Sequence, residues 1–167
     1  MKVGRITVSD RAAAGTYEDL SGPEIENTLR KFLDGEAEFV SVIVPDEADL
    51  IAAALRNFAD ARHCDLVITT GGTGIARRDV TPEATRALLD KELPGFGEAM
   101  RAQSFAAVRT ALLSRATAGA RGRTLIVNLP GKPAAVRLCL QILAPAILEG
   151  VAHLRGEDPH AAATCKK

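Results

Sequence analysis

A run of threonines and glycines, Thr69-Thr-Gly-Gly-Thr-Gly74, is the part of this 167-residue sequence best suited to bind an anion. Glycines adopt positive φ angles without strain, so several backbone N–H groups can face one anion, and the threonine hydroxyls add donors. A tight strand-to-helix turn would need only one glycine, so we favour a phosphate-binding loop over a plain turn. Neither common nucleotide fingerprint fits. Arg77 stands where the dinucleotide loop has its third glycine, and Pro133 follows Gly131-Lys132 where a P-loop has serine or threonine.

Charged residues follow this loop directly. Arg77 and Arg78 would add donors and positive potential for a polyphosphate. Asp79 beside them makes sense if Mg²⁺ bridges its carboxylate and a phosphate, although a solvated turn with an Asp–Arg pair explains the spacing equally well. Asp46 follows another predicted strand, where its simplest role is the N-cap of a helix. Two carboxylates that converge at one sheet edge would nevertheless suit a hard cation.

Further polar clusters are Ser9-Asp10-Arg11, Ser114-Arg115, Thr117-Ala-Gly119 and Asn128-Leu-Pro-Gly-Lys132. The last of these needs a sharp turn, which would present N–H groups at the start of the final helix as an anion site. No histidine or cysteine lies in these loops, so a Ser/His or Cys/His nucleophile has no candidate base. Glycine amides, hydroxyls, basic side chains and aspartates are instead the groups used in phosphoryl or nucleotidyl transfer.

Strand-like and helix-like segments alternate along the chain, which predicts an α/β fold with a parallel sheet covered on both faces. The predicted strands cover residues 2–9, 38–44, 65–70 and 124–128, with a short one at 111–115. Helices are expected from a capping box at residues 21–24, from Asp46, from a Thr81 N-cap and from Pro133, with a weaker one near 96–107. Ligands bind beyond the carboxyl ends of parallel strands, so the loops 9–20, 45–46, 71–81 and 129–133 should form the site.

Composition excludes several classes of protein. Lys and Arg number 21 and so do Asp and Glu, which argues against a nucleic-acid binder with a large basic field. Cys64, Cys139 and Cys165 show no metal-ligand spacing. We find no signal-peptide segment and no apolar run approaching the length of a membrane span, so we expect a cytoplasmic protein with no membrane partner. Residues 1–167 should form one domain, with a flexible tail from about residue 157.

Taken together, these motifs resemble the molybdopterin adenylyltransferases, bacterial enzymes of molybdenum cofactor synthesis that are akin to the G domain of gephyrin. The resemblance runs in order through almost the whole chain, and residues 71–85 are its most specific part. The matching motifs cover residues 8–11, 45–46, 69–74, 76–85, 94–98, 113–115 and 128–131.

The resemblance implies a three-layer α/β/α sandwich and transfer of AMP from Mg-ATP to the terminal phosphate of molybdopterin, with release of pyrophosphate. It also implies a homotrimer and a separate molybdenum-insertion protein as downstream partner. Asp46 and Asp79 match two essential aspartates, which we assign to catalysis and to Mg²⁺. The residues that match nucleotide- or molybdopterin-binding positions are Ser9, Asp10, Gly71, Gly72, Thr73, Gly74, Arg78, Ser114, Asn128, Pro130 and Gly131.

One alternative stays open within this family. A homologue can keep the glycine loop and bind molybdopterin as a trimeric carrier, with weak or lost adenylylation. The presence of both Asp46 and Asp79 favours the enzyme. The zero net charge argues only against long polyanions, because Arg77, Arg78 and Lys132 are predicted to lie at one sheet edge, where they would attract a small polyphosphate.

Overall fold

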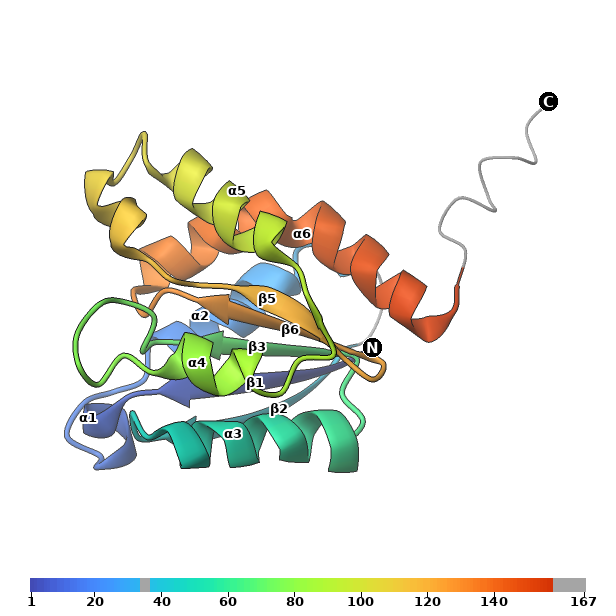
Figure 1. Cartoon of the computed structure of the whole chain (residues 1–167), viewed down its shortest axis with the longest axis horizontal. Helices are drawn as coiled ribbons and strands as arrows, with labels where there is room; N and C mark the ends of the chain where they lie inside the picture. Colours follow the sequence, from blue (N-terminus) through green and yellow to red (C-terminus); the bar gives the residue numbers. More distant parts are fainter. Residues whose placement is uncertain (34–36, 158–167) are drawn as a thin grey trace.

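Four parallel strands make up most of the sheet, and the loops of the predicted site follow them (Figure 1). The computed structural model describes residues 1–33 and 37–157, and its six strands follow the order β2-β1-β3-β6-β5-β4. The parallel strands are β1 (Lys2–Val8), β2 (Glu38–Val44), β3 (Leu66–Thr70) and β6 (Thr124–Leu129). Strands β5 (Ala118–Arg121) and β4 (Lys91–Glu92) complete one edge in antiparallel pairing. The prediction of a mainly parallel sheet is confirmed.

Helices cover both faces of the sheet and so complete three layers (Figure 1). One core cluster joins the sheet to α2 (Ser21–Leu29), α5 (Pro94–Ser104) and α6 (Pro133–Arg155). A second cluster, on the opposite face, joins it to α3 (Ala48–Arg56) with the π-helical turn η1 (Asn57–Ala61), and to α4 (Thr81–Arg86). Two short turns, α1 (Asp10–Ala13) and the 3₁₀ turn η2 (Arg109–Leu113), lie in connecting loops. The α/β/α sandwich is therefore confirmed.

The central strands show why this arrangement could be predicted. In β3, Leu66 and Ile68 belong to one core cluster while Val67 between them belongs to the other. Every residue of β3 and of β6 is buried. A strand covered on both faces is mostly apolar, and such nearly continuous apolar segments are easy to recognise in a sequence.

Some local predictions about the ends of elements are wrong. Ser21 is the first residue of α2 and not its cap; Asp19 Oδ1 accepts the N–H groups of Ser21 and Gly22, at 3.1 and 2.8 Å. Thr81 likewise begins α4, after Val80. The short strand predicted at residues 111–115 is not present; η2 ends there, and the next strand is β5. The predicted flexible tail lies, from residue 158, outside the described residues.

Helix α6 has the length and apolar composition of a membrane span, so the expectation that no segment approaches this was wrong. Its packing is nevertheless that of a core helix. Val136, Leu140, Leu143 and Ile147 recur at helical spacing and are almost fully buried in the first core cluster against the sheet. Length and composition cannot distinguish these two roles, whereas the contacts of the inward face can.

Candidate active site

The carboxyl ends of the four parallel strands bring the predicted loops together at one edge of the sheet. The N–H of Ser9, after β1, donates to the carbonyl of Val44 at the end of β2. The hydroxyl of Thr70, at the end of β3, donates to the carbonyl of Pro130 after β6, at 2.8 Å. Parallel register thus places four loops side by side, as Figure 1 shows for the ends of these strands.

The glycine loop packs too closely against its neighbours for larger residues. Gly71 and Gly72 have φ angles of 98° and 61°, in the left-handed region. A Cβ atom on Gly71 would lie 2.2 Å from the carbonyl oxygen of Val8, and one on Gly72 would lie 2.3 Å from Oγ1 of Thr81. No backbone N–H from residues 72 to 75 donates a hydrogen bond to any residue that the structure describes. These four consecutive amides are therefore unpaired among the described residues, as the amides of an anion-binding loop are before the anion binds.

Asp46 lies beside this loop and does not cap a helix, so the N-cap interpretation was wrong. Helix α3 begins at Ala48 after Glu47, and Asp46 Oδ2 instead accepts the N–H of Asp10 at 2.8 Å. Oδ1 of Asp46 is 3.2 Å from the position of a Cβ on Gly72. Burial raises the pKa of Asp46 above its usual value of 3.8, and the nearby charges of Asp10 and Asp79 raise it further.

Arg78 forms a bidentate ion pair with Asp10. Its Nε and Nη2 atoms lie 2.6 and 2.7 Å from the two carboxylate oxygens, and this bonding lowers the pKa of Asp10. Both side chains are substantially exposed. Arg78 thus brings positive charge to the site, although in this state Asp10 partly offsets it.

Asp79 lies at the far end of the glycine loop. Its Oδ2 accepts the N–H of Ala76 at 2.7 Å and is 2.8 Å from the position of a Cβ on Gly74. Among the described residues, no group of three or more acidic, histidine or cysteine side chains could hold a metal ion by itself. Mg²⁺ in nucleotide sites usually takes one or two carboxylates and completes its shell with phosphate oxygens and water. The negative charges of Asp10 and Asp79 repel that of Asp46, and a cation bound with a polyphosphate would relieve this repulsion.

Two of the predicted binding residues have different surroundings from those expected. Asn128 is fully buried in β6, where its Nδ2 lies 3.0 and 2.9 Å from the hydroxyl oxygens of Thr69 and Thr85. It ties β3 to α4 beneath the site and presents no surface to a ligand. Ser114 is only partly exposed, and its Oγ accepts the N–H of Ala116 at 3.3 Å.

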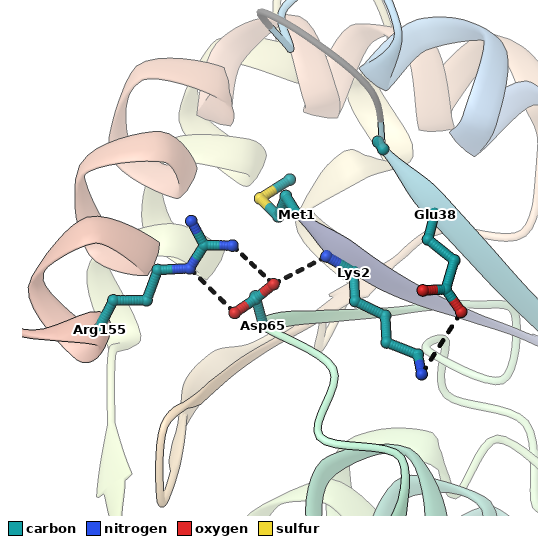
Figure 2. Close-up of a pocket in the computed structure, with 6 residues that line it drawn as sticks. Met1, Lys2, Glu38, Asp65 and Arg155 are labelled. Carbon is teal, nitrogen blue, oxygen red and sulfur yellow. Dashed lines mark hydrogen bonds and ion pairs between the residues drawn. The ribbon is translucent and has the colours of Figure 1, made fainter.

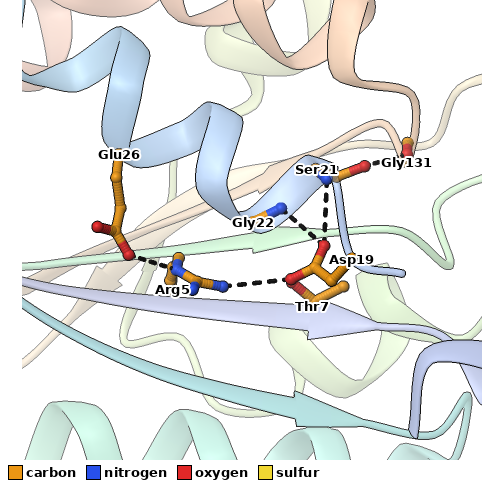
Figure 3. A network of polar contacts seen from close by, with 7 residues as sticks. All are labelled: Arg5, Thr7, Asp19, Ser21, Gly22, Glu26 and Gly131. Carbon is orange, nitrogen blue, oxygen red and sulfur yellow. Dashed lines mark hydrogen bonds and ion pairs between the residues drawn. The ribbon is translucent and has the colours of Figure 1, made fainter. Parts of the chain in front are cut away.

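The turn at Pro130 and Gly131 lies next to the glycine loop. A Cβ on Gly131 would be 3.3 Å from the Cα of Gly71. The Ser21 hydroxyl donates to the Gly131 carbonyl at 2.6 Å, and Asp19 in turn accepts from the N–H of Ser21 (Figure 3). Asp19 also accepts the hydroxyl of Thr7, and its ion pair with Arg5 is largely buried. This network fixes the turn at the start of α6. No local sequence pattern predicts it, because Arg5, Asp19 and Gly131 are far apart in the chain.

A polar pocket of about 410 Å³ lies at the opposite end of the parallel strands from the candidate site (Figure 2). Its charged groups are already paired. Arg155 binds both oxygens of Asp65, at 2.9 and 2.7 Å, and Lys2 forms an ion pair with Glu38. These contacts join the end of α6 to the starts of the strands. The paired charges of this pocket indicate a role in stability.

The fold and this edge define a class of protein. A family model described as a probable molybdopterin binding domain matches residues 4–149. The chain belongs to this family of molybdopterin-binding domains.

Particular relatives narrow the comparison. The molybdopterin adenylyltransferase of Helicobacter pylori (strain J99) is 53% identical over 145 residues, which is 87% of this chain and 82% of the relative. The molybdopterin adenylyltransferase of Escherichia coli (strain K12) is 45% identical over 141 residues, 84% of this chain and 72% of the relative. The crystal structure of a molybdopterin biosynthesis protein from Mycobacterium abscessus matches with a TM-score of 0.84 and 39% identity, over 93% of this chain and 96% of that one.

Proposed function

We propose that this protein transfers AMP from ATP to the terminal phosphate of molybdopterin, giving adenylyl-molybdopterin and pyrophosphate. One observation carries the proposal: the amides of residues 72–75 donate to no described residue, and the loop has Asp46 at one end and Asp79 at the other. Unpaired amides beside carboxylates suit a phosphate group that arrives with a cation. The relatives named molybdopterin adenylyltransferases support the choice of substrate.

In this reaction an oxygen of the molybdopterin phosphate bonds to the α-phosphorus of ATP. The bond from that phosphorus to the bridging oxygen of the β-phosphate breaks, and pyrophosphate leaves with the electron pair. A phosphate monoester is ionised at neutral pH, so the attacking oxygen needs no general base. The loops of the site contain no histidine or cysteine, and this reaction does not call for one. Positioning and electrostatic stabilisation are then the main tasks of the protein.

The residues of the site divide these tasks. The amides of residues 72–75 and the start of α6 bind phosphate oxygens, and Arg78 adds a guanidinium group. Mg²⁺ held by Asp46 and Asp79 would neutralise the triphosphate. We assign Asp46 to the side of the α-phosphate and Asp79 to the side of the pterin. The other predicted contacts are Ser9, Asp10, Ser114, Pro130 and Gly131.

The same proposal includes a homotrimer in the cytoplasm and a molybdenum-insertion protein that receives the product. An apolar groove between α5 and α6 offers one surface for contact between copies; it is lined by Leu93, Phe96, Ala99, Ile142 and Ala146, among others. Light scattering on the protein eluted from a size-exclusion column should give a molar mass three times that of one chain. A monomeric mass would contradict the trimer and leave the adenylylation proposal to be tested separately.

The decisive experiment mixes the purified protein with ATP, Mg²⁺ and molybdopterin and follows both pyrophosphate and adenylylated pterin. We expect the two products in equal amounts, and neither when Mg²⁺ or molybdopterin is left out. Tight binding of molybdopterin without any release of pyrophosphate would contradict the enzyme and support the carrier alternative.

A further inference from the structure

We propose that Arg115 is the positioning residue of this site: it holds the two ends of the segment 74–79 together, and so fixes both the glycine-loop amides and Asp79 for a metal-bound triphosphate. The inference rests on the proposed function. Arg115 lies between η2 and β5, outside the loop that it organises.

The contacts of Arg115 reach both ends of that loop. Its backbone N–H donates to the carbonyl of Thr73 at 2.8 Å, and its Nε donates to the carbonyl of Gly74 at 2.6 Å. Its Nη2 donates to the carbonyl of Asp79, and its Nη1 pairs with the carboxylate of Glu83 in the first turn of α4. One side chain thus bonds the loop at both ends and also bonds the helix that follows.

These bonds set the direction of the neighbouring amides. In a trans peptide unit, the C=O of one residue and the N–H of the next point in opposite directions. Because the carbonyls of Thr73 and Gly74 face Arg115, the N–H groups of Gly74 and Ile75 point away from it. Both are among the amides that donate to no described residue. The carbonyls behind the loop are therefore satisfied by Arg115, and the amides in front stay available to phosphate.

The same anchoring fixes Asp79. Its carbonyl is held by Arg115 while its N–H donates to Ala76 at 2.9 Å and its carboxylate accepts from Ala76. The backbone of Asp79 is thus bonded on two sides, which leaves its side chain little freedom. A planar guanidinium group reaches several acceptors in a fixed fork, whereas a lysine ammonium reaches them one or two at a time. This predicts that lysine replaces Arg115 only in part.

The test compares Arg115→Gln, Arg115→Lys and a matched control, Arg121→Gln, with the wild type. Arg121 is a suitable control because its guanidinium also bonds a carbonyl, that of Leu88, and a carboxylate, that of Asp60, at a place remote from the glycine loop. Three readouts apply to each protein: turnover as a function of Mg²⁺ concentration, binding of ATP with Mn²⁺ in the absence of molybdopterin, and hydrogen exchange of amides 73–80. Thermal unfolding reports the general loss of stability.

For Arg115→Gln we expect the half-saturating Mg²⁺ concentration to rise about 10-fold or more, as the loss of charge-assisted hydrogen bonds predicts. Binding of Mn-ATP should weaken similarly, and amides 73–80 should exchange faster. Arg115→Lys should recover part of each effect, and Arg121→Gln should lower the melting temperature without any of them. Unchanged metal dependence, unchanged Mn-ATP binding and unchanged exchange in Arg115→Gln would overturn the inference. If the wild type forms no product, the proposed function fails, and nucleotide binding and exchange still test the role of Arg115.

Discussion

Asp10 and Asp46 exchange hydrogen bonds: the N–H of each donates to the carboxylate of the other, at 2.8 and 3.0 Å. This reciprocal pair joins the start of α1 to the loop after β2 and brings two negative side chains together at the carboxyl edge of the sheet. Arg78 binds Asp10, whereas Asp46 has no ion pair with a described residue. Burial and neighbouring charges raise the pKa of Asp46, so this edge gains from a bound cation.

Replacement of Asp46 by asparagine separates the chemical role of its charge from the structural role of its hydrogen bond. In Asp46→Asn, the side-chain oxygen still accepts the N–H of Asp10, and only the charge is lost. We expect turnover to fall by about 100-fold or more, as for a key electrostatic contact. Because the pKa of Asp46 is higher in the folded than in the unfolded protein, its ionisation lowers the free energy of unfolding as the pH rises from about 3.8 through the folded-state pKa. Asparagine does not ionise, so Asp46→Asn should be at least as stable as the wild type at pH 7. A lower melting temperature with unchanged activity per folded molecule would show a purely structural role.

Replacement of Asp79 should lower turnover as replacement of Asp46 does. In Asp79→Asn, the side-chain oxygen can still accept the N–H of Ala76, so the 76–79 turn should persist. Turnover should fall by about 100-fold or more. Steady-state assays and circular dichroism spectra, measured on the same preparation, check both expectations. Near-normal turnover would remove Asp79 from the active site.

A pair of glycine substitutions distinguishes backbone strain from the close packing of the site. Gly72 and Gly122 both have positive φ angles, 61° and 53°, so alanine costs about 1–2 kcal/mol of backbone strain at either position. A Cβ on Gly72 also meets Thr81 and approaches Asp46, whereas one on Gly122 meets no atom within 4 Å. We expect Gly72→Ala to weaken ATP binding, measured by calorimetry, and Gly122→Ala to leave it unchanged. Equal affinities in the two variants would contradict the proposed place of Gly72 in the site.

The ion pair at the opposite edge should act on stability alone. The hydrogen bonds from Arg155 lower the pKa of Asp65 below 3.8, and both side chains are less than a third exposed. A lowered pKa stabilises the fold above 3.8, and this contribution is lost as the pH falls through the folded-state value. Asp65→Asn should therefore cost about 1–3 kcal/mol at pH 7, and less in acid. Urea unfolding at both pH values measures this difference, while turnover per folded molecule should match the wild type.

The sequence predicted where Asp46 lies in the fold but not what its carboxylate contacts. Asp46 follows the predicted strand at residues 38–44, and aspartate is a preferred N-cap residue, so capping the next helix was its simplest predicted role. In the structure its carboxylate instead accepts the backbone N–H of Asp10, which is 36 residues away in the chain. The pattern at residues 124–128 predicts that Asn128 ends a buried strand, and only the resemblance suggests that it binds a ligand; in the structure its amide lies between Thr69 and Thr85.

By itself, the sequence determined the layers of this protein and the loops that meet at the carboxyl edge of its sheet. Apolar periodicity fixes which face of each element is buried, and parallel strands place their carboxyl ends together. Only the tertiary structure decided which backbone and side-chain groups within those loops are already paired. The network from Asp19 through Ser21 to Gly131 and the bonds from Arg115 to the glycine loop join residues distant in the chain. Local patterns carry no record of such pairings, which depend on how the loops fold against one another.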